Sequence, residues 1–132
     1  METMETLVDL VAVAGARFDR HPALLIRPFF RTRTWRFRDL AAIVPKAARV
    51  LADSGIGPGD RVIVWSVNRP EWGIGFFALA HRGAVAVPLD VRHTLDFGQK
   101  IVAQTEAKLV LASRQTDDVA RQLGLQIGRA HV

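Results

Sequence analysis

The polar residues best suited to chemistry are thinly spread along this chain. Asp90 and Arg92 directly follow an apolar run, the position at which open α/β sheets hold their ligands. Asp60 carries a carboxylate that could serve as a general base. It follows Pro58-Gly59, however, and an aspartate just after such a turn commonly accepts hydrogen bonds from the turn's own backbone. We therefore expect a structural role for Asp60 and retain Asp90 and Arg92 as candidates without assigning either a catalytic role.

Nucleophile and metal sites have less support. Three serines (Ser54, Ser66 and Ser113) lack the flanking glycines that place a nucleophilic serine on a tight strand-to-helix turn. His81 and His93 lack a third ligand, and we expect His81 to lie at the carbonyl end of a helix, where positive charge is favourable. The chain has no cysteine, which excludes disulfides, thiolate ligands and a cysteine nucleophile.

Phosphate binding requires backbone N–H groups close to an anion, usually in a glycine-rich loop at a helix N-terminus. The turn from Ser66 to Glu71 follows a predicted strand and precedes a predicted helix, but it has no closely spaced glycines. Glu71 would also repel a phosphate. We predict no catalytic, cofactor-binding or metal-ligating residue in this chain, and a free-standing α/β nucleotide-binding module is kept as an alternative.

Arginines alternate with aromatic residues in one stretch. The net charge is +5, and five arginines (Arg27, Arg31, Arg33, Arg36 and Arg38) are interleaved with four aromatics (Phe29, Phe30, Trp35 and Phe37). This pattern is found where aromatics stack on single-stranded nucleic acid and arginines neutralise its phosphates. It is also what a hairpin with one solvated and one buried face requires. We favour the hairpin and predict no nucleic-acid partner, with an arginine-rich nucleic-acid-binding domain as the second alternative.

Length and composition indicate one folded domain. The 132 residues are 49% apolar and 23% charged, values ordinary for a globular protein with a core. The apolar run that begins at Leu7 is interrupted by Asp9 and is too short to span a bilayer. It follows Glu2 and Glu5 instead of a basic stretch, so we do not expect a signal peptide. The lack of cysteine favours a cytoplasmic location.

Hydrophobic periodicity predicts alternating helices and strands. Helices are expected over residues 6–19 and 38–54, from a capping box of Asn68 and Glu71 to Gly83, after a cap at Thr94, and from 115 to 123. Strands are expected over residues 23–26, 34–37, 61–65, 84–89 and 108–112, the last three buried on both faces. The predicted fold class is α/β, with a short antiparallel hairpin and a mainly parallel sheet covered by helices on both faces.

The last seven residues, 126–132, continue none of these patterns. They match the in-frame translation of a common sequencing-library adapter. We therefore predict a partial domain over residues 1–125 and a non-native tail over residues 126–132.

Several short motifs occur together in a fixed order. They include Gly57-Pro58-Gly59-Asp60-Arg61-Val62, then Asn68-Arg69-Pro70-Glu71-Trp72, then Gly83-Ala84-Val85-Ala86-Val87-Pro88-Leu89. With the flanking segments they cover residues 6–113, and in this order they resemble the opening subdomain of AMP-forming acyl-CoA synthetases, members of the adenylate-forming superfamily. The sequence Pro88-Leu89-Asp90-Val91-Arg92 is more similar to the long-chain fatty acyl branch than to the peptide-synthetase branch.

The resemblance implies a truncated N-terminal subdomain of a much longer ligase. Such an enzyme joins a carboxylic acid, here a fatty acid, to AMP with MgATP, and then transfers the acyl group to coenzyme A. The family's phosphate loop and catalytic lysine would lie downstream, so we expect this fragment to be inactive and carry no family catalytic residue onto it. One departure is Arg36, where the family usually has Thr or Ser. The lost helix cap should cost about 1 kcal/mol unless another group replaces it.

Overall fold

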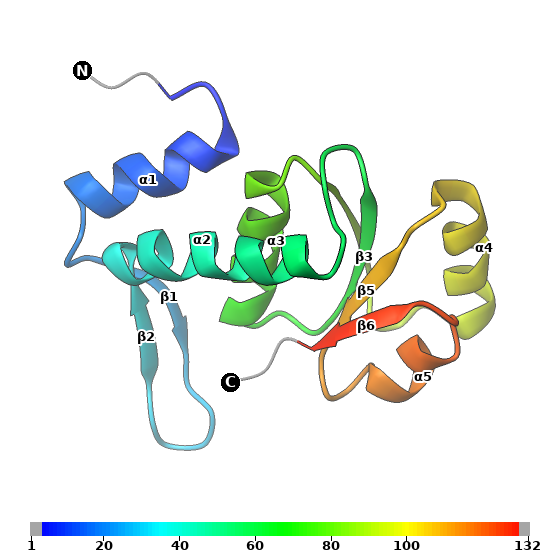
Figure 1. The fold of residues 1–132 in the computed structure, drawn as a ribbon. Helices are drawn as coiled ribbons and strands as arrows, with labels where there is room; N and C mark the ends of the chain where they lie inside the picture. Colours follow the sequence, from blue (N-terminus) through cyan, green and yellow to red (C-terminus); the bar gives the residue numbers. More distant parts are fainter. Residues whose placement is uncertain (1–3, 130–132) are drawn as a thin grey trace.

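The computed structural model describes residues 4–129, which form five helices and six strands (Figure 1). The helices are α1 (Leu7–Arg17), α2 (Phe37–Asp53), α3 (Pro70–His81), α4 (Leu95–Thr105) and α5 (Asp117–Arg121). The strands are β1 (Pro22–Ile26), β2 (Arg33–Arg36), β3 (Arg61–Trp65), β4 (Val85–Leu89), β5 (Leu109–Ala112) and β6 (Gln126–Arg129). No helix within residues 4–129 is long and apolar enough to cross a bilayer.

The predicted α/β class is confirmed. Strands β1 and β2 pair as an antiparallel hairpin, and the other four strands form a parallel sheet in the order β4-β3-β5-β6. Parallel neighbours require crossover connections, and the intervening helices supply them. The hairpin extends away from this sheet, below α2 in Figure 1.

Strand β3 is the centre of the core because its side chains alternate between two apolar layers. Val62 and Val64 pack with residues of α2 and α3, including Leu51 and Leu79. Ile63 and Trp65 point to the opposite face and pack with residues of α4 and α5, including Ala120. The continuous apolar run in the sequence of β3 is therefore explained by burial of the strand on both faces.

A third apolar cluster attaches the N-terminal elements to this layered core. Val11 of α1, Leu40 and Val44 of α2, and Ile74 of α3 are buried together, with Leu24 and Trp35 of the hairpin packed against them. At the crossing of α1 and α2, a Cβ atom added to Gly15 would overlap the Cβ atom of Ala41. The absence of a side chain at Gly15 lets the two helices approach closely.

The prediction that β4 is buried on both faces is wrong. Val85 and Pro88 are exposed, and Leu89 is its one buried residue. The cause is strand order, since β4 lies at the edge of the sheet and pairs with β3 alone within the described chain. Pro88 lacks an N–H group, which makes it suited to an edge strand.

The predicted cap of α3 is also wrong. The residue at the N-cap is Arg69, and Pro70 is the first helical residue, where its fixed φ and missing N–H carry no penalty. Asn68 therefore lies one residue too early to cap. Glu71 pairs instead with Arg69, at 3.3 Å between Oε2 and Nε.

At the start of α2, Asp39 replaces half of the expected cap. Arg36 has no acceptor atom in its side chain, but its backbone N–H donates to Asp39 Oδ2 at 2.7 Å. The Asp39 carboxylate in the first turn thus partly offsets the expected loss of a Thr or Ser cap. Its negative charge also interacts favourably with the helix dipole.

The C-terminal segment differs from the patternless tail that the sequence predicts. Residues 126–129 form β6, which pairs in parallel with β5, and Ile127 packs against the cluster around α4 and α5. Residues 130–132 of the predicted tail lie outside the described residues. The adapter origin of this segment stays a prediction.

Candidate functional site

The strand order reverses between β3 and β5. The chain leaves β3 toward β4 on one side and leaves β5 toward β6 on the other, so the two connections diverge. In open parallel sheets, the crevice beyond the carboxyl ends of two such strands is the usual ligand site. In this chain the residues that follow those ends are Ser66 after β3 and Ser113 after β5.

Thr116 closes this crevice. Its Oγ1 donates to the carbonyl of Trp65 at the end of β3 and accepts the N–H of Ser113 at 3.1 Å. The backbone N–H of Val67 donates to Ser113 Oγ at 3.4 Å, which ties the two connections together. Ser66, Ser113 and Thr116 are 8%, 4% and 3% exposed, so all three residues are buried.

The polar atoms of this cluster are already satisfied. Ser66 Oγ donates to the carbonyl of Val67 at 3.0 Å, and no buried side-chain N or O atom in the described residues lacks a partner. A ligand at this position would have to replace existing hydrogen bonds. The site at the strand reversal is therefore filled by the protein itself, and neither Ser66 nor Ser113 has a neighbouring base that would make it a nucleophile.

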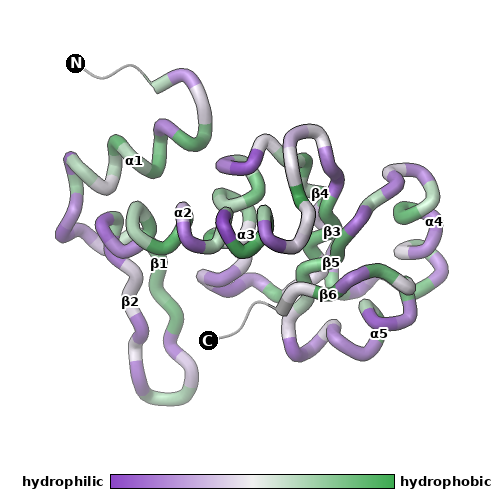
Figure 2. Tube along the Cα trace, viewed as in Figure 1, coloured by the Kyte–Doolittle hydropathy of each residue, from purple (hydrophilic) through white to green (hydrophobic). Residues whose placement is uncertain are grey.

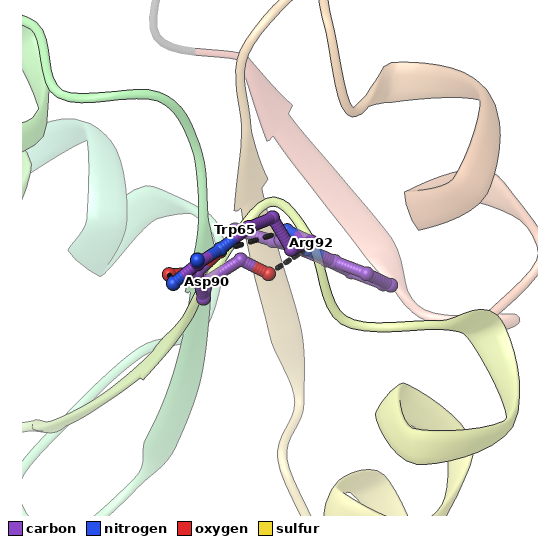
Figure 3. Close-up of polar contacts among 3 residues, drawn as sticks. All are labelled: Trp65, Asp90 and Arg92. Carbon is purple, nitrogen blue, oxygen red and sulfur yellow. Dashed lines mark hydrogen bonds and ion pairs between the residues drawn. The ribbon is translucent and has the colours of Figure 1, made fainter.

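Asp90 and Arg92 lie after β4 and bind each other (Figure 3). Arg92 Nε and Nη2 donate to the two carboxylate oxygens of Asp90, each at 2.9 Å, and the backbone N–H of Arg92 donates to Oδ1 at 2.8 Å. These bonds hold the pKa of Asp90 well below its usual range and raise the pKa of Arg92. The indole N–H of Trp65 donates to the Asp90 carbonyl at 3.1 Å, so the pair fastens the end of β4 to β3.

This geometry gives Asp90 and Arg92 a local structural role. The guanidinium that could attract an anion is neutralised by a bidentate carboxylate, and the carboxylate is too acidic to serve as a base near neutral pH. The turn between β4 and α4 is the feature that the pair stabilises.

Asp60 binds the turn that precedes it, as the sequence predicts. Its Oδ2 accepts the backbone N–H of Gly57 at 2.8 Å, and its Oδ1 lies 3.0 Å from Nζ of Lys108. The hydrogen bond from Gly57, followed by the contact with Lys108, lowers the pKa of Asp60. Gly59, with φ of +80°, supplies the left-handed conformation that the turn requires.

The histidines lie in different parts of the fold. His81 ends α3, at the expected carbonyl end, and the His93 ring centroid lies 4.3 Å from that of Phe97 in α4. Ser54 follows α2 and serves as its C-cap. Across residues 4–129, no three His, Asp or Glu side chains gather closely enough to hold a metal ion.

Sequence reasoning missed two features. The first is Thr116, for which the Ser-x-x-Thr spacing after a buried strand is the local signal of such a hydrogen-bonded turn. The second feature is the hairpin tip, where Phe29 and Phe30 are 95% and 93% exposed. The alternation in the sequence predicts that the aromatic residues share one buried face. In the structure only Trp35 and Phe37 of the four are partly buried.

Comparison with known proteins identifies the fold. Residues 11–130 match a family described as AMP-binding enzyme. The oxalate–CoA ligase of Arabidopsis thaliana is 29% identical over 97% of this chain, which spans 24% of that protein's length.

Two solved structures share the architecture. A protein from Rhodopseudomonas palustris named as a long-chain-fatty-acid CoA ligase superposes with a TM-score of 0.84 at 23% identity, over 95% of this chain and 32% of its own. The fatty acyl-adenylate ligase of L. pneumophila superposes with a TM-score of 0.86 at 20% identity, over 97% of this chain and 24% of its own. The likeness to these structures defines the fold of the chain.

Proposed function

This chain belongs to the AMP-binding enzyme family, and on that premise we propose that it is the N-terminal scaffold of a longer ATP-dependent acyl-CoA synthetase. The proposed reaction has two steps. A carboxylate oxygen attacks the α-phosphorus of ATP and displaces pyrophosphate, and the thiol of coenzyme A then attacks the acyl carbon and displaces AMP. The chain covers about a quarter of its curated relative, which leaves room for the groups that perform these steps elsewhere.

The observation that carries the proposed scaffold role is the closed crevice at the strand reversal. ATP would need backbone N–H groups in a glycine-rich loop, and Mg²⁺ would need several oxygen ligands. The connections after β3 and β5 supply neither. The Thr116 hydroxyl is already hydrogen-bonded to the Ser113 N–H and to the Trp65 carbonyl. The residues of these two connections do not fit ATP or Mg²⁺, and we propose no step in catalysis for them.

The proposed role of this segment is structural support. Its sheet fixes the direction of β3 and β5, and its helices cover both faces. In the proposed parent enzyme, further segments would bind ATP, Mg²⁺ and coenzyme A against this support.

Fatty acids are the proposed acid substrates. Support comes from the Pro88-Leu89-Asp90-Val91-Arg92 motif and from the names of the two matching structures, which refer to long-chain fatty acids and fatty acyl adenylates. The oxalate ligase shows that relatives also act on a small, polar diacid. The lack of cysteine in this chain supports a cytoplasmic location for the enzyme.

Recovery of the parent gene tests the proposal. We expect the sequence downstream of codon 125 to encode a Ser/Thr/Gly-rich loop with a lysine, and the native codons to replace those of residues 126–132. The encoded enzyme should exchange labelled pyrophosphate into ATP more efficiently with long-chain fatty acids than with oxalate. A preference for oxalate would refute the substrate class and leave the family unchanged.

The 132-residue chain provides the second test. It should release no pyrophosphate from ATP with palmitate and coenzyme A, while the parent enzyme serves as the positive control. Release at a rate that depends on the fatty acid would show that the chain itself contains the ATP site.

A further inference from the structure

The positive charge of this protein is concentrated in the hairpin and the residues that flank it. Residues 20–38 contain six arginines and no acidic residue, whereas the rest of the chain has twelve basic and thirteen acidic residues and is nearly neutral. All six arginines are exposed: Arg20, Arg27, Arg31, Arg33, Arg36 and Arg38. None of them forms an ion pair with a carboxylate of residues 4–129.

The tip of the hairpin is apolar. A turn closed by a hydrogen bond from Arg31 N–H to the Pro28 carbonyl, at 3.3 Å, places Phe29 and Phe30 at its two central positions. Their side chains are 95% and 93% exposed and stack on no other ring. Figure 2 shows this apolar stretch with hydrophilic residues on both sides.

The backbone at the tip is unfavourable for a phenylalanine. Phe29 has φ of +58°, a left-handed conformation that glycine or asparagine adopts more readily in such a turn. Packing inside the described chain does not account for the choice of residue, because Phe29 is 95% exposed. The tip combines two exposed aromatic rings with unpaired arginines on both sides of it in the chain, at Arg27 and at Arg31 and Arg33.

We propose that this hairpin tip docks on the surface of a bilayer that contains anionic lipids. Phe29 and Phe30 enter the boundary between headgroups and acyl chains, where aromatic side chains are favoured. Arg27, Arg31 and Arg33 lie beside them and bind lipid phosphates, since basic residues next to a membrane are attracted to its anionic leaflet.

The shape of the tip favours a bilayer over a nucleic acid. A single strand is bound along a groove in which successive bases stack on successive rings. In this hairpin the two exposed rings belong to adjacent residues at the tip. Trp35 is half-buried against residues of α2, and Phe37, also half-buried, is the first residue of that helix. A projecting point with apolar tip and basic flanks suits a flat surface that accepts apolar groups below a layer of phosphates.

Sedimentation with vesicles tests this inference. The 132-residue chain is mixed with vesicles of phosphatidylcholine alone or of phosphatidylcholine and phosphatidylserine in equal amounts. We expect binding to the anionic vesicles that weakens as salt is raised. The double substitution Phe29→Ala and Phe30→Ala should lower the partition coefficient at least about tenfold, because each ring loses its transfer from water. Substituting Arg27, Arg31 and Arg33 together by Gln should lower it about a hundredfold.

Matched controls separate the tip from general charge and apolarity. The triple substitution of Arg17, Arg49 and Arg114 by Gln removes the same charge elsewhere, and Val50→Ala removes an exposed apolar group from α2. Both should bind within about twofold of the original chain. Circular dichroism of each variant verifies that it is folded.

Three results would overturn the inference. The first is equal binding to both kinds of vesicle, or to neither. The second is tighter binding to a single-stranded oligonucleotide than to anionic vesicles, with the same dependence on Phe29 and Phe30. The third is a stable dimer that the phenylalanine substitutions dissociate. The inference requires no ATP chemistry, so its outcome is independent of the proposed ligase function.

Discussion

Replacing Thr116 by valine should destabilise the protein strongly, because valine keeps the shape of threonine and removes its hydroxyl. The Trp65 carbonyl then loses a donor, and the Ser113 N–H loses its acceptor at 3.1 Å. Thr116 is 3% exposed, so water cannot easily replace either partner. A buried polar group left without a partner costs about 1–3 kcal/mol. We therefore expect Thr116→Val to lower the free energy of unfolding by about 2–4 kcal/mol in total.

Urea titration measures this loss, followed by circular dichroism and by tryptophan fluorescence. A domain of this size has a total stability of about 5–15 kcal/mol, so the shift in the midpoint should be large. Thr116→Ser retains the hydroxyl and should cost about 1 kcal/mol for the lost methyl group. Thr94→Val removes an exposed helix cap and should also cost about 1 kcal/mol. A Thr116→Val variant as stable as Thr116→Ser, or more stable, would refute this reasoning. It would show that the hydrogen bonds of the Thr116 hydroxyl do not stabilise this part of the fold.

Three further changes test other parts of the structure. Gly15→Ala should lower the free energy of unfolding by about 1–2 kcal/mol, because overlap with Ala41 outweighs the gain in helix propensity. Gly73→Ala places a Cβ atom 3.5 Å from Leu24 Cδ1, an ordinary contact distance, and should raise the free energy of unfolding by about 0.5–1 kcal/mol in the same urea assay. Equal effects at the two glycines would contradict the close helix crossing. Phe29→Gly should raise it by up to about 1 kcal/mol by relieving the left-handed φ, a gain that thermal unfolding would detect and that a loss of stability would disprove. Asp60→Asn should destabilise the protein at neutral pH, because the folded state lowers the pKa of this carboxyl from its ordinary value of 3.8. That stabilisation is present above 3.8 and is lost as the pH falls through the lower folded-state pKa, so the two unfolding curves should converge in acid, and a constant gap would count against the lowered pKa.

Local patterns were sufficient to predict most elements. The strand over residues 61–65 and the cap at Thr94 occur as predicted, because each depends on side chains within a few residues. Gly55 and Gly83 close helices with positive φ for the same reason. The cap at Asn68 failed because Pro70 competes for the start of α3, and the fixed φ of proline decided the boundary.

The candidate site was less accessible to prediction. The carboxyl end of β4 was recognised as a position of interest, but the sequence could not show that Arg92 is bound to Asp90 by three hydrogen bonds. It also could not show that Thr116, more than fifty residues from Trp65 in the chain, donates to the Trp65 carbonyl. Such partners are set by how β3 and β5 lie side by side.

The sequence by itself determined the succession of helices and strands, the parallel sheet and the resemblance to adenylate-forming enzymes, because periodicity, caps and turn residues act over short distances. Only the tertiary structure decided that β4 is an edge strand, that β6 continues the sheet, that the strand-reversal crevice is closed, and that Phe29 and Phe30 are free at the hairpin tip. Each of these depends on which segments become neighbours in space. Burial and pairing of that kind are fixed by the whole packed chain, so no short window of residues contains them.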